Sequence, residues 1–149
     1  MPVEINSNQM AQFWESIEAS LSEMKESIFQ RLAYIGEASV KKAREIGNYQ
    51  DRTANLRSSI GYMIVMDGEV VTQSTPEQAG SGSTDGSEGI AQGTALLNKL
   101  KSELPSKGAV LVVCAGMQYA WYVEHVHHKD VLASAELEAE RLVKKMFNT

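Results

Sequence analysis

The sequence predicts an α+β fold, in which a long N-terminal helix and further helices pack on a small, mostly antiparallel sheet. First, apolar residues recur at spacings of three and four through the first third of the chain. Second, Asp67-Gly68 separates two short strand-like runs. Third, helices and strands do not alternate along the chain as they do in a doubly wound fold. A chain of 149 residues has the size of one domain.

Residues 1–47 form the predicted N-terminal helical segment. Asn6, Ser7 and Asn8 offer side chains that can cap the first turn. Gly36 is expected to kink or interrupt the helix, and Gly47-Asn48 to end it. A continuous helix of this length would extend roughly 60 Å, since each residue adds about 1.5 Å. So long a helix exceeds the core of one small domain, so part of it should meet another helix or another subunit.

The expected contact with another helix or subunit rests on one apolar stripe of the N-terminal helix, whose spacing is close to that of a coiled-coil seam. Its predicted interface residues are Trp14, Ile17, Leu21, Met24 and Ile28, flanked by Met10, Leu32 and Ile35. The alternative is that these residues, with Phe13 and Phe29, pack in the core of their own domain. Seam and core use the same residue types, so the sequence leaves both interpretations open.

Residues 49–73 are predicted to form a turn followed by a β-hairpin. The strands are Ile60–Val65 and Glu69–Thr72, and Asp67-Gly68 suits a tight turn that needs positive φ at both central positions. Residues 74–89 contain almost nothing apolar and are predicted to be a flexible loop.

Residues 90–149 are predicted to contain helix, strand and helix. A helix over 90–103 is stopped by Pro105, and the apolar run 109–115 suits a central strand covered on both faces. A helical turn is expected within 117–126, and Asp130 can cap a last helix. That last helix carries an apolar stripe made by Leu132, Ala135, Ala139, Leu142 and Met146.

The net charge, the apolar runs and the single cysteine argue against several classes of function. The net charge of −5 argues against a general nucleic-acid binder, which needs a basic face. No apolar run is long enough for a membrane span, and no secretory signal is visible. The single cysteine, Cys114, lies within an apolar run and is expected to be a buried, inert thiol.

Few residues group into a catalytic or metal-binding pattern. His125, His127 and His128 cluster near Glu124 and Asp130, but their spacing suits no regular metal site. Exposed loop histidines are the simplest interpretation, and pH-sensitive interface contacts or a metal site are the alternatives. No serine or cysteine nucleophile stands beside a base, and no cofactor is predicted.

Asp51, Arg52 and Arg57 precede the first strand and are expected to play a structural part. Asp51 can accept backbone hydrogen bonds that open a turn or short helix. The two arginines could pair with carboxylates across a subunit boundary, where the guanidinium favours bidentate contact.

Two segments together resemble the head–tail joining or tail-completion (minor tail) proteins of long-tailed bacteriophages. The first, residues 51–62, is similar to the family's threonine-glycine-x-leucine-arginine-x-serine segment, with Ala54 where glycine is usual. The second, residues 115–124, is similar to its tyrosine-alanine-x-tyrosine-valine-glutamate signature. After it, this chain has His125-Val126-His127-His128 where the family continues with a glycine-containing loop. The resembling positions are Asp51, Arg52, Thr53, Leu56, Arg57, Tyr119, Trp121, Tyr122 and Glu124.

The resemblance implies a non-enzymatic virion assembly protein that forms a homo-oligomeric ring. Such a ring closes the tail or joins it to the head, contacts other neck or tail proteins, and lets DNA pass through its lumen. An acidic subunit suits a lumen that should not hold DNA tightly. The aromatic residues near 119–122 would supply interface area, unless they pack on the strand beneath them.

Two other functions remain open at the level of sequence. One is a homodimeric interaction or adaptor module that uses the N-terminal amphipathic helix. The other is a small enzyme using His125, His127 or Asp51, for which no nucleophile, base and orienting group can be named together.

Overall fold

A computed structural model describes residues 4, 6–46, 54–74, 85–117, 120–125 and 130–147 of the chain. It confirms the predicted α+β class, with a long N-terminal helix, a three-stranded antiparallel sheet and further helices. The elements in chain order are α1 (Ser7–Ile46), α2 (Asn55–Ser58), β1 (Ile60–Met66), β2 (Glu69–Gln73), α3 (Ser87–Leu100), the 3₁₀ turn η1 (Lys101–Glu103), β3 (Ala109–Ala115), α4 (Ala120–His125) and α5 (Ala133–Phe147).

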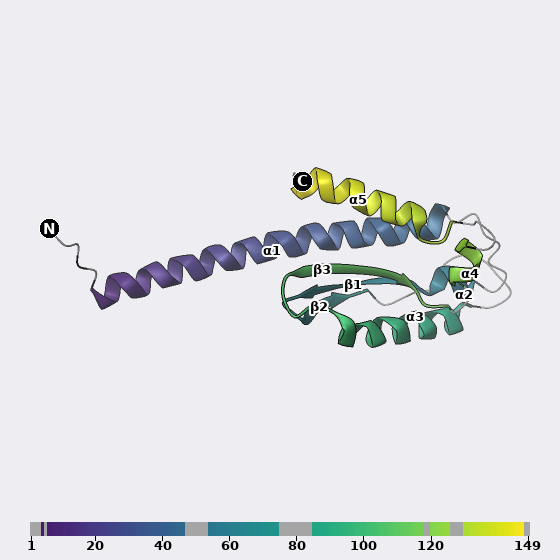
Figure 1. Cartoon of the computed structure of the whole chain (residues 1–149), viewed down its shortest axis with the longest axis horizontal. Helices are drawn as coiled ribbons and strands as arrows, with labels where there is room; N and C mark the ends of the chain where they lie inside the picture. Colours follow the sequence, from purple (N-terminus) through teal and green to yellow (C-terminus); the bar gives the residue numbers. More distant parts are fainter. Residues whose placement is uncertain are drawn as a thin grey trace.

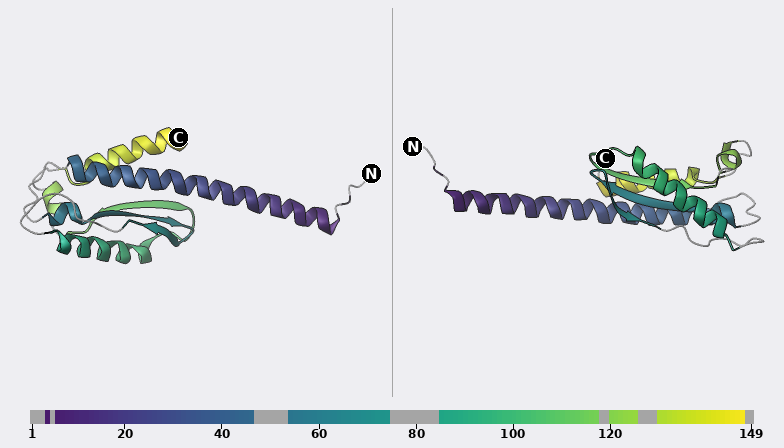
Figure 2. Two further views of the ribbon diagram at one scale, coloured as in Figure 1. Left: turned by 180° about the vertical axis from the view of Figure 1, so that it is seen from behind. Right: turned by 90° about the horizontal axis from the view of Figure 1, so that it is seen from below.

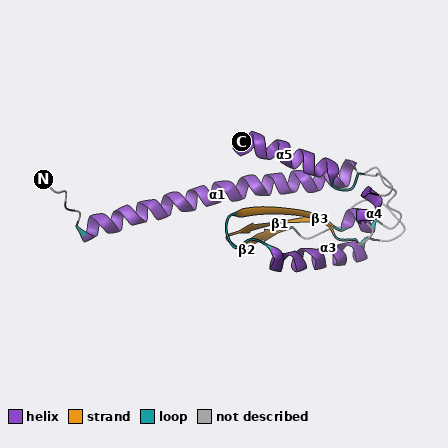
Figure 3. Cartoon of the chain, in the orientation of Figure 1, coloured by secondary structure: helices purple, strands orange, loops and turns teal. Residues whose placement is uncertain are grey.

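The elements form layers around the sheet, whose strand order is β2-β1-β3 (Figure 1). The C-terminal half of α1 covers one face of the sheet, and α3 covers the other. Helix α5 packs along α1, as Figure 3 also shows. The N-terminal half of α1 extends beyond all of these layers (Figure 2).

Helix α1 begins with a reciprocal cap, as its polar first residues predicted. The Gln9 N–H donates to Oδ1 of Asn6 at 2.9 Å, and the Asn6 N–H donates to Oε1 of Gln9 at 3.1 Å. The expected break at Gly36 is wrong, because α1 runs through it as one helix of 40 residues. Gly36 instead allows close packing, since a Cβ atom there would lie 2.6 Å from Cδ2 of Tyr62. The predicted end at Gly47-Asn48 lies outside the described residues.

The predicted hairpin is confirmed, with each strand one residue longer than expected. Asp67 and Gly68 have φ values of 52° and 85°, as a tight hairpin turn requires. The Asp67 carboxylate also accepts the Gly108 N–H at 3.0 Å. The turn is therefore fixed to the start of β3 as well as to its own strands.

The prediction that 109–115 forms a central strand is wrong. The strand exists, but β3 is an edge strand, and β1 is central because it pairs with both neighbours. Helices lie over both faces of the sheet, so an edge strand here needs apolar residues on both faces. The apolar residues of 109–115 therefore reflect the helices that cover both faces of the sheet, and they do not indicate a central position in the strand order.

The predicted boundary between the loop 74–89 and the helix 90–103 is also wrong. Helix α3 begins at Ser87, and the α-helix gives way to η1 after Leu100. Gly89 in the first turn packs against the backbone of Asn55, too closely for any side chain. The polar residues from Ser87 onward are therefore helical because the contact between Gly89 and Asn55 stabilises the first turn of α3. Residues 75–84 of the predicted loop lie outside the described residues.

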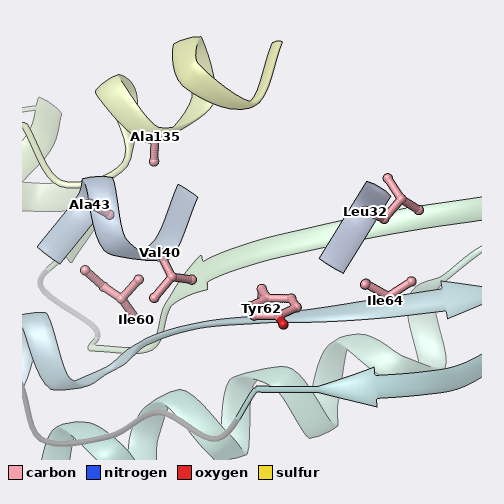
Figure 4. Close-up of a cluster of buried hydrophobic side chains, with 7 residues drawn as sticks. All are labelled: Leu32, Val40, Ala43, Ile60, Tyr62, Ile64 and Ala135. Atoms are coloured by element: carbon pink, nitrogen blue, oxygen red, sulfur yellow. The ribbon is translucent and has the colours of Figure 1, made fainter. Parts of the chain in front are cut away.

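Two apolar clusters share the central strand, which turns alternate residues toward opposite faces. Toward α1, Ile60, Tyr62 and Ile64 pack against α1 and Ala135 of α5 (Figure 4). Toward α3, Met63 and Val65 pack with Leu97 and Cys114. These residues are buried, so the core lies where the C-terminal half of α1, the sheet and α3 overlap.

Candidate functional site

Residues 55–58 of the first resembling segment form the short helix α2, which is anchored on α3. Asn55 opens α2, its Oδ1 accepts the Gly89 N–H at 3.1 Å, and its Nδ2 donates to Oε2 of Glu88 at 3.3 Å. Ser59 donates its hydroxyl to the Leu56 carbonyl at 2.7 Å. Asn55 and Ser59 are buried, so this polar segment has a structural role: it connects α2 to α3, and we call this connection the joint. Sequence reasoning missed Asn55, because nothing in the sequence links it to Gly89.

Ala54 holds an unusual backbone conformation at the start of this helix. Its φ is 63°, in the left-handed region that favours glycine, and its side chain is fully buried. This is the position at which the resembling family usually has glycine. The chain therefore keeps the conformation that glycine favours while carrying alanine.

Arg57 connects this joint to the end of α1. Its Nε donates to the Arg44 carbonyl at 3.1 Å, and Nη2 of Arg44 donates to the Ile60 carbonyl at 2.8 Å. The two arginines thus tie the last turns of α1 to the start of β1. Asp51, Arg52 and Thr53 lie outside the described residues, so the turn opened by Asp51 and the pairing of Arg52 and Arg57 with carboxylates across a subunit boundary stay predictions.

The second resembling segment follows β3 and reaches α5. The Gly116 N–H donates to the Ser59 carbonyl at 3.2 Å, which joins the two segments through the backbone. Oε1 of Glu124 in α4 accepts the N–H groups of Leu132 and Ala133 at 3.2 and 2.8 Å. Glu124 therefore satisfies free donors at the start of α5, where a carboxylate is favoured.

A small apolar cluster brings both segments together. Leu56 from the first segment packs with Met117 and Ala120 from the second, and Val131 completes the cluster. All four are buried. The cluster lies at the end of the sheet opposite the hairpin turn, near α2 and α4 (Figure 1). Tyr119 and the side chains of Trp121 and Tyr122 lie outside the described residues, so their interface role stays a prediction.

Asp130 acts as predicted at the start of the last helix. Its Oδ1 accepts the Ser134 N–H at 3.1 Å, and its other carboxylate oxygen contacts the Ser134 hydroxyl. With Glu124, this places two carboxylates around the first turn of α5. Both are used in helix capping.

Two buried groups have raised pKa values. Burial, and then the nearby Glu37 carboxylate, raise the pKa of Tyr62 to about 12. The Tyr62 hydroxyl donates to Oε1 of Glu37 at 2.8 Å. Burial raises the pKa of the Cys114 thiol to about 11, which makes it a poor nucleophile near neutral pH, as its apolar run predicted.

The histidines give no described metal site. His125 is exposed at the end of α4, and His127 and His128 lie outside the described residues. Among the residues with described placement, no group of three or more His, Cys, Asp or Glu side chains could hold a metal ion.

The second candidate surface is the first half of the long helix, residues 7–24, which we call the arm. No other described element covers the arm (Figure 2). Ile17 is half-buried, and Lys25 just beyond the arm pairs with Asp67 at 3.6 Å. The large apolar side chains exposed on the arm are Met10, Phe13, Trp14, Leu21 and Met24.

The stripe on α1 is therefore divided between two environments. Leu32 and Ile35 are buried against the sheet, whereas Trp14 is 55% and Met24 is 61% exposed. Ile28 lies at the boundary and is half-buried. The C-terminal half of the stripe therefore packs in the core of its own domain. The half on the arm stays exposed, and the interface predicted there stays a prediction.

No known protein family, curated protein or solved structure matches this chain. None of the described helices has both the length and the hydropathy that crossing a bilayer requires.

Proposed function

We propose that this chain is a non-enzymatic virion assembly protein of a long-tailed bacteriophage, a head–tail connector or tail-completion subunit. In this proposal it forms a homo-oligomeric ring in the virion, contacts other neck or tail proteins, and encircles passing DNA without a cofactor. The observation that carries the proposal is the packing of Leu56 against Met117 and Ala120. Through it, two segments distant in sequence, which resemble one family in order and spacing, meet at one joint.

Two further observations support this proposal. Ala54 has a φ of 63° at the position where the family usually has glycine, so the backbone there suits the family's residue. The exposed arm supplies apolar area for contact with other subunits. Monomeric soluble proteins rarely leave so many large apolar side chains together in water.

Electron microscopy and light scattering at several protein concentrations test the ring. We expect closed rings of uniform diameter, or ring formation once neighbouring neck or tail proteins are added. Particles from the source phage or prophage should contain the chain in a fixed ratio to the portal protein. A chain that stays monomeric with every neck and tail component and is absent from particles would refute the proposal.

A second candidate function is a homodimeric adaptor, and the arm specifically favours it. Its apolar residues Trp14, Ile17, Leu21 and Met24 keep the alternating spacing of three and four that a two-helix seam uses. Sedimentation equilibrium separates the two functions. An adaptor reaches a dimer and stops, whereas a ring subunit goes on to a larger closed assembly.

A further inference from the structure

The sheet has an unprotected edge at β3. The strand order is β2-β1-β3, and no described strand pairs with the outer side of β3. The seven residues of β3 include no charge and no proline, and their register with β1 is regular throughout. The other edge strand, β2, begins with Glu69, and a register shift interrupts its pairing with β1. Charges, prolines and bulges keep edge strands from pairing with other chains, and β3 has none of them.

The register of the ladder shows which backbone groups of β3 point outward. The Asp67 N–H donates to the Gly108 carbonyl at 2.9 Å, and the Gly116 N–H donates to the Ser59 carbonyl at 3.2 Å. Hydrogen-bonded pairs alternate along an antiparallel ladder, so the even-numbered residues between these two also face β1. The N–H and carbonyl groups of residues 109, 111, 113 and 115 therefore point away from β1, and no described residue bonds to them. We call these outward groups the free edge.

An apolar groove lies beside the free edge. It has a volume of about 730 Å³ and lies between α5 and β3. Side chains alternate between the faces of a strand, so the residues that form the free edge also direct their side chains toward this groove. A segment paired with the free edge would thus place every second side chain in the groove. The apolar residues that line the groove include Ala109, Leu111 and Val113 of β3 and Ala135, Ala139 and Val143 of α5.

The free edge selects an extended segment over a helix. The backbone groups of an α-helix bond within the helix, so a helix in the groove would cover the free edge without bonding to it. A three-turn helix with a diameter of about 11 Å also occupies roughly 1,500 Å³, which is about twice the volume of the groove. An extended strand lies about 4.8 Å from its neighbour and offers N–H and carbonyl groups at the matching repeat.

The rim of the groove favours a basic partner. Glu136 and Glu140 are exposed along it, and neither forms an ion pair with a described residue. Lys144, one helical turn further along α5, also lines the groove. Because α5 runs opposite to β3 (Figure 1), the two carboxylates lie toward the end of β3 and Lys144 lies toward its start. An occupant with lysine or arginine near the end of β3 matches this arrangement.

A second copy of the chain does not suit the site. Pairing β3 with β3 would bring a second α5, with its own Glu136 and Glu140, to an edge that already has two carboxylates. Pairing β3 with β2 would bring Glu69, and α1 lies beside β2 in the same copy. In both arrangements a helix of the second copy would enter the space beside α5. A lone extended segment of another protein brings no covering helix, and basic residues in it match the rim.

We propose that β3 accepts an extended segment of another protein as an additional strand beside α5. The segment alternates apolar residues, which enter the groove, with polar residues on the opposite face, and it carries lysine or arginine near Glu136 and Glu140. In this mode of recognition the main-chain hydrogen bonds supply affinity, and the pockets for alternate side chains supply specificity. The site is separate from the arm and does not depend on ring formation.

A synthetic peptide tests the site. The probe is a fluorescent peptide as long as β3, in which valine and threonine alternate and two arginines precede the first valine. In antiparallel pairing the arginines lie near Glu136 and Glu140. One version is N-methylated on its valines, whose N–H groups would face β3, and another on its threonines, whose N–H groups would face away. We expect fluorescence anisotropy to show at least tenfold weaker binding for the valine-methylated peptide. Equal affinities for the two methylated peptides, or no binding of the unmodified peptide at millimolar concentration, would overturn the proposal.

Variants of the protein test the same site from the other side. Leu111→Pro removes an outward N–H and leaves the hydrogen bonds to β1 in place, so it should raise the dissociation constant of the peptide at least tenfold. Leu111→Ala loses the same side chain, keeps the N–H and should weaken binding less.

Ala139→Trp fills the groove from α5 and should also weaken binding at least tenfold. Leu137→Trp is its control, because Leu137 is 68% exposed on α5 and does not line the groove, and it should bind as the wild type does. Thermal unfolding shows whether each variant is folded. A folded Ala139→Trp that binds the peptide normally would contradict the proposed site, even if Leu111→Pro does not fold.

Amide hydrogen exchange, followed by NMR, identifies the occupant of the free edge. In the dilute chain the amides of residues 110, 112 and 114 should be protected, because they bond to β1, whereas those of 109, 111, 113 and 115 should exchange fast. The peptide should slow exchange in the second set. Protection of that set in the dilute chain would mean that the chain covers its own edge. Protection that rises with chain concentration would mean that a second copy binds there. Either result overturns the proposal.

Discussion

At the scale of single residues, Ala54 combines a left-handed backbone with complete burial. An L-residue with a Cβ atom loses roughly 1–2 kcal/mol in that conformation compared with the right-handed one. The contact between the two resembling segments begins two residues later, at Leu56. The chain therefore tolerates local strain at the joint on which the proposed function depends.

Substitution at Ala54 should separate backbone strain from packing. Ala54→Gly should change the free energy of unfolding by less than about 1 kcal/mol, because relief of strain offsets the lost methyl group and the more flexible unfolded chain. Ala54→Val should destabilise by more than about 2 kcal/mol, since a β-branched side chain fits positive φ poorly and the site is buried. Urea denaturation measures both. Similar losses for glycine and valine would contradict a left-handed Ala54.

Gly36 provides a second residue-scale prediction. Gly36→Ala should destabilise the protein by about 1–3 kcal/mol, because the new Cβ atom would collide with the Tyr62 ring. Helix propensity alone predicts the opposite sign, because replacing glycine by alanine within a helix stabilises the protein by about 1 kcal/mol. Ser20→Ala at an exposed α1 position is the control and should change stability by less than about 0.5 kcal/mol. A stabilised Gly36→Ala would mean that α1 and Tyr62 are further apart.

The raised pKa of Tyr62 predicts a loss of stability at high pH. Burial and the Glu37 carboxylate favour the neutral phenol in the folded protein and raise its pKa to about 12, above the usual value of 10.0. The stabilisation is therefore complete below pH 10 and is lost as the pH rises from about 10 to 12. Urea denaturation across this range should show a steeper fall for the wild-type protein than for Tyr62→Phe. Equal slopes would contradict this assignment.

Residues whose role is local were predictable from the sequence, and residues whose role is tertiary were not. Asn6 caps α1 and Asp67 forms the hairpin turn through hydrogen bonds and φ angles that involve near neighbours. Gly36 was expected to break the helix, because its reason for being glycine lies in Tyr62, far along the chain. Asn55 was missed because its partner, Gly89, lies 34 residues further along the chain, beyond the whole β1–β2 hairpin.

At the scale of elements, α1 performs two tasks with one apolar stripe. Its C-terminal half covers the sheet, and its arm has no covering element within the described chain. Isolated helices are marginal in water even when their propensity is high. The arm should therefore exchange its amide hydrogens faster than the C-terminal half of α1 in the monomer, and become protected on assembly.

Charges placed on the arm should prevent assembly and leave the fold intact. Leu21→Glu with Met24→Glu should abolish self-association, because both side chains are more than half exposed and would bring charge into a buried contact. The free energy of unfolding of the monomer should change by less than about 0.5 kcal/mol. Sedimentation equilibrium and urea denaturation measure the two effects. Glu23→Gln on the exposed polar face is the control and should assemble normally.

The element order was predictable, but the arrangement of elements in space was not. The apolar run 109–115 was recognised as a strand, yet its edge position follows from pairing with β1, which lies far away in sequence. The apolar residues of α5 were recognised as a stripe, but the sequence could not indicate that part of it faces a groove. Pairing and layer order are decided by contacts between distant segments, which no local pattern records.

At the scale of the whole molecule, the arm should report assembly through its own tryptophan. The chain has two tryptophans, so Trp121→Phe leaves Trp14 as the sole indole emitter. Trp14 is 55% exposed in the single chain, and its emission should shift to shorter wavelength as protein concentration rises and the arm becomes covered. Fluorescence across a dilution series measures this. Emission that stays at the wavelength of exposed indole in an established oligomer would place the contact elsewhere on the molecule.

The position of α1 before the sheet and α5 in the chain has a consequence for synthesis on the ribosome. The stripe on α1 is made before the residues that cover its second half, because translation must proceed from Leu32 to Ala135 to complete their cluster. Until then the whole stripe is exposed to solvent, and afterwards the arm still is. Nascent copies on one messenger are therefore exposed to premature association. Chaperones that hold apolar segments should bind this chain early, before any assembly partner does.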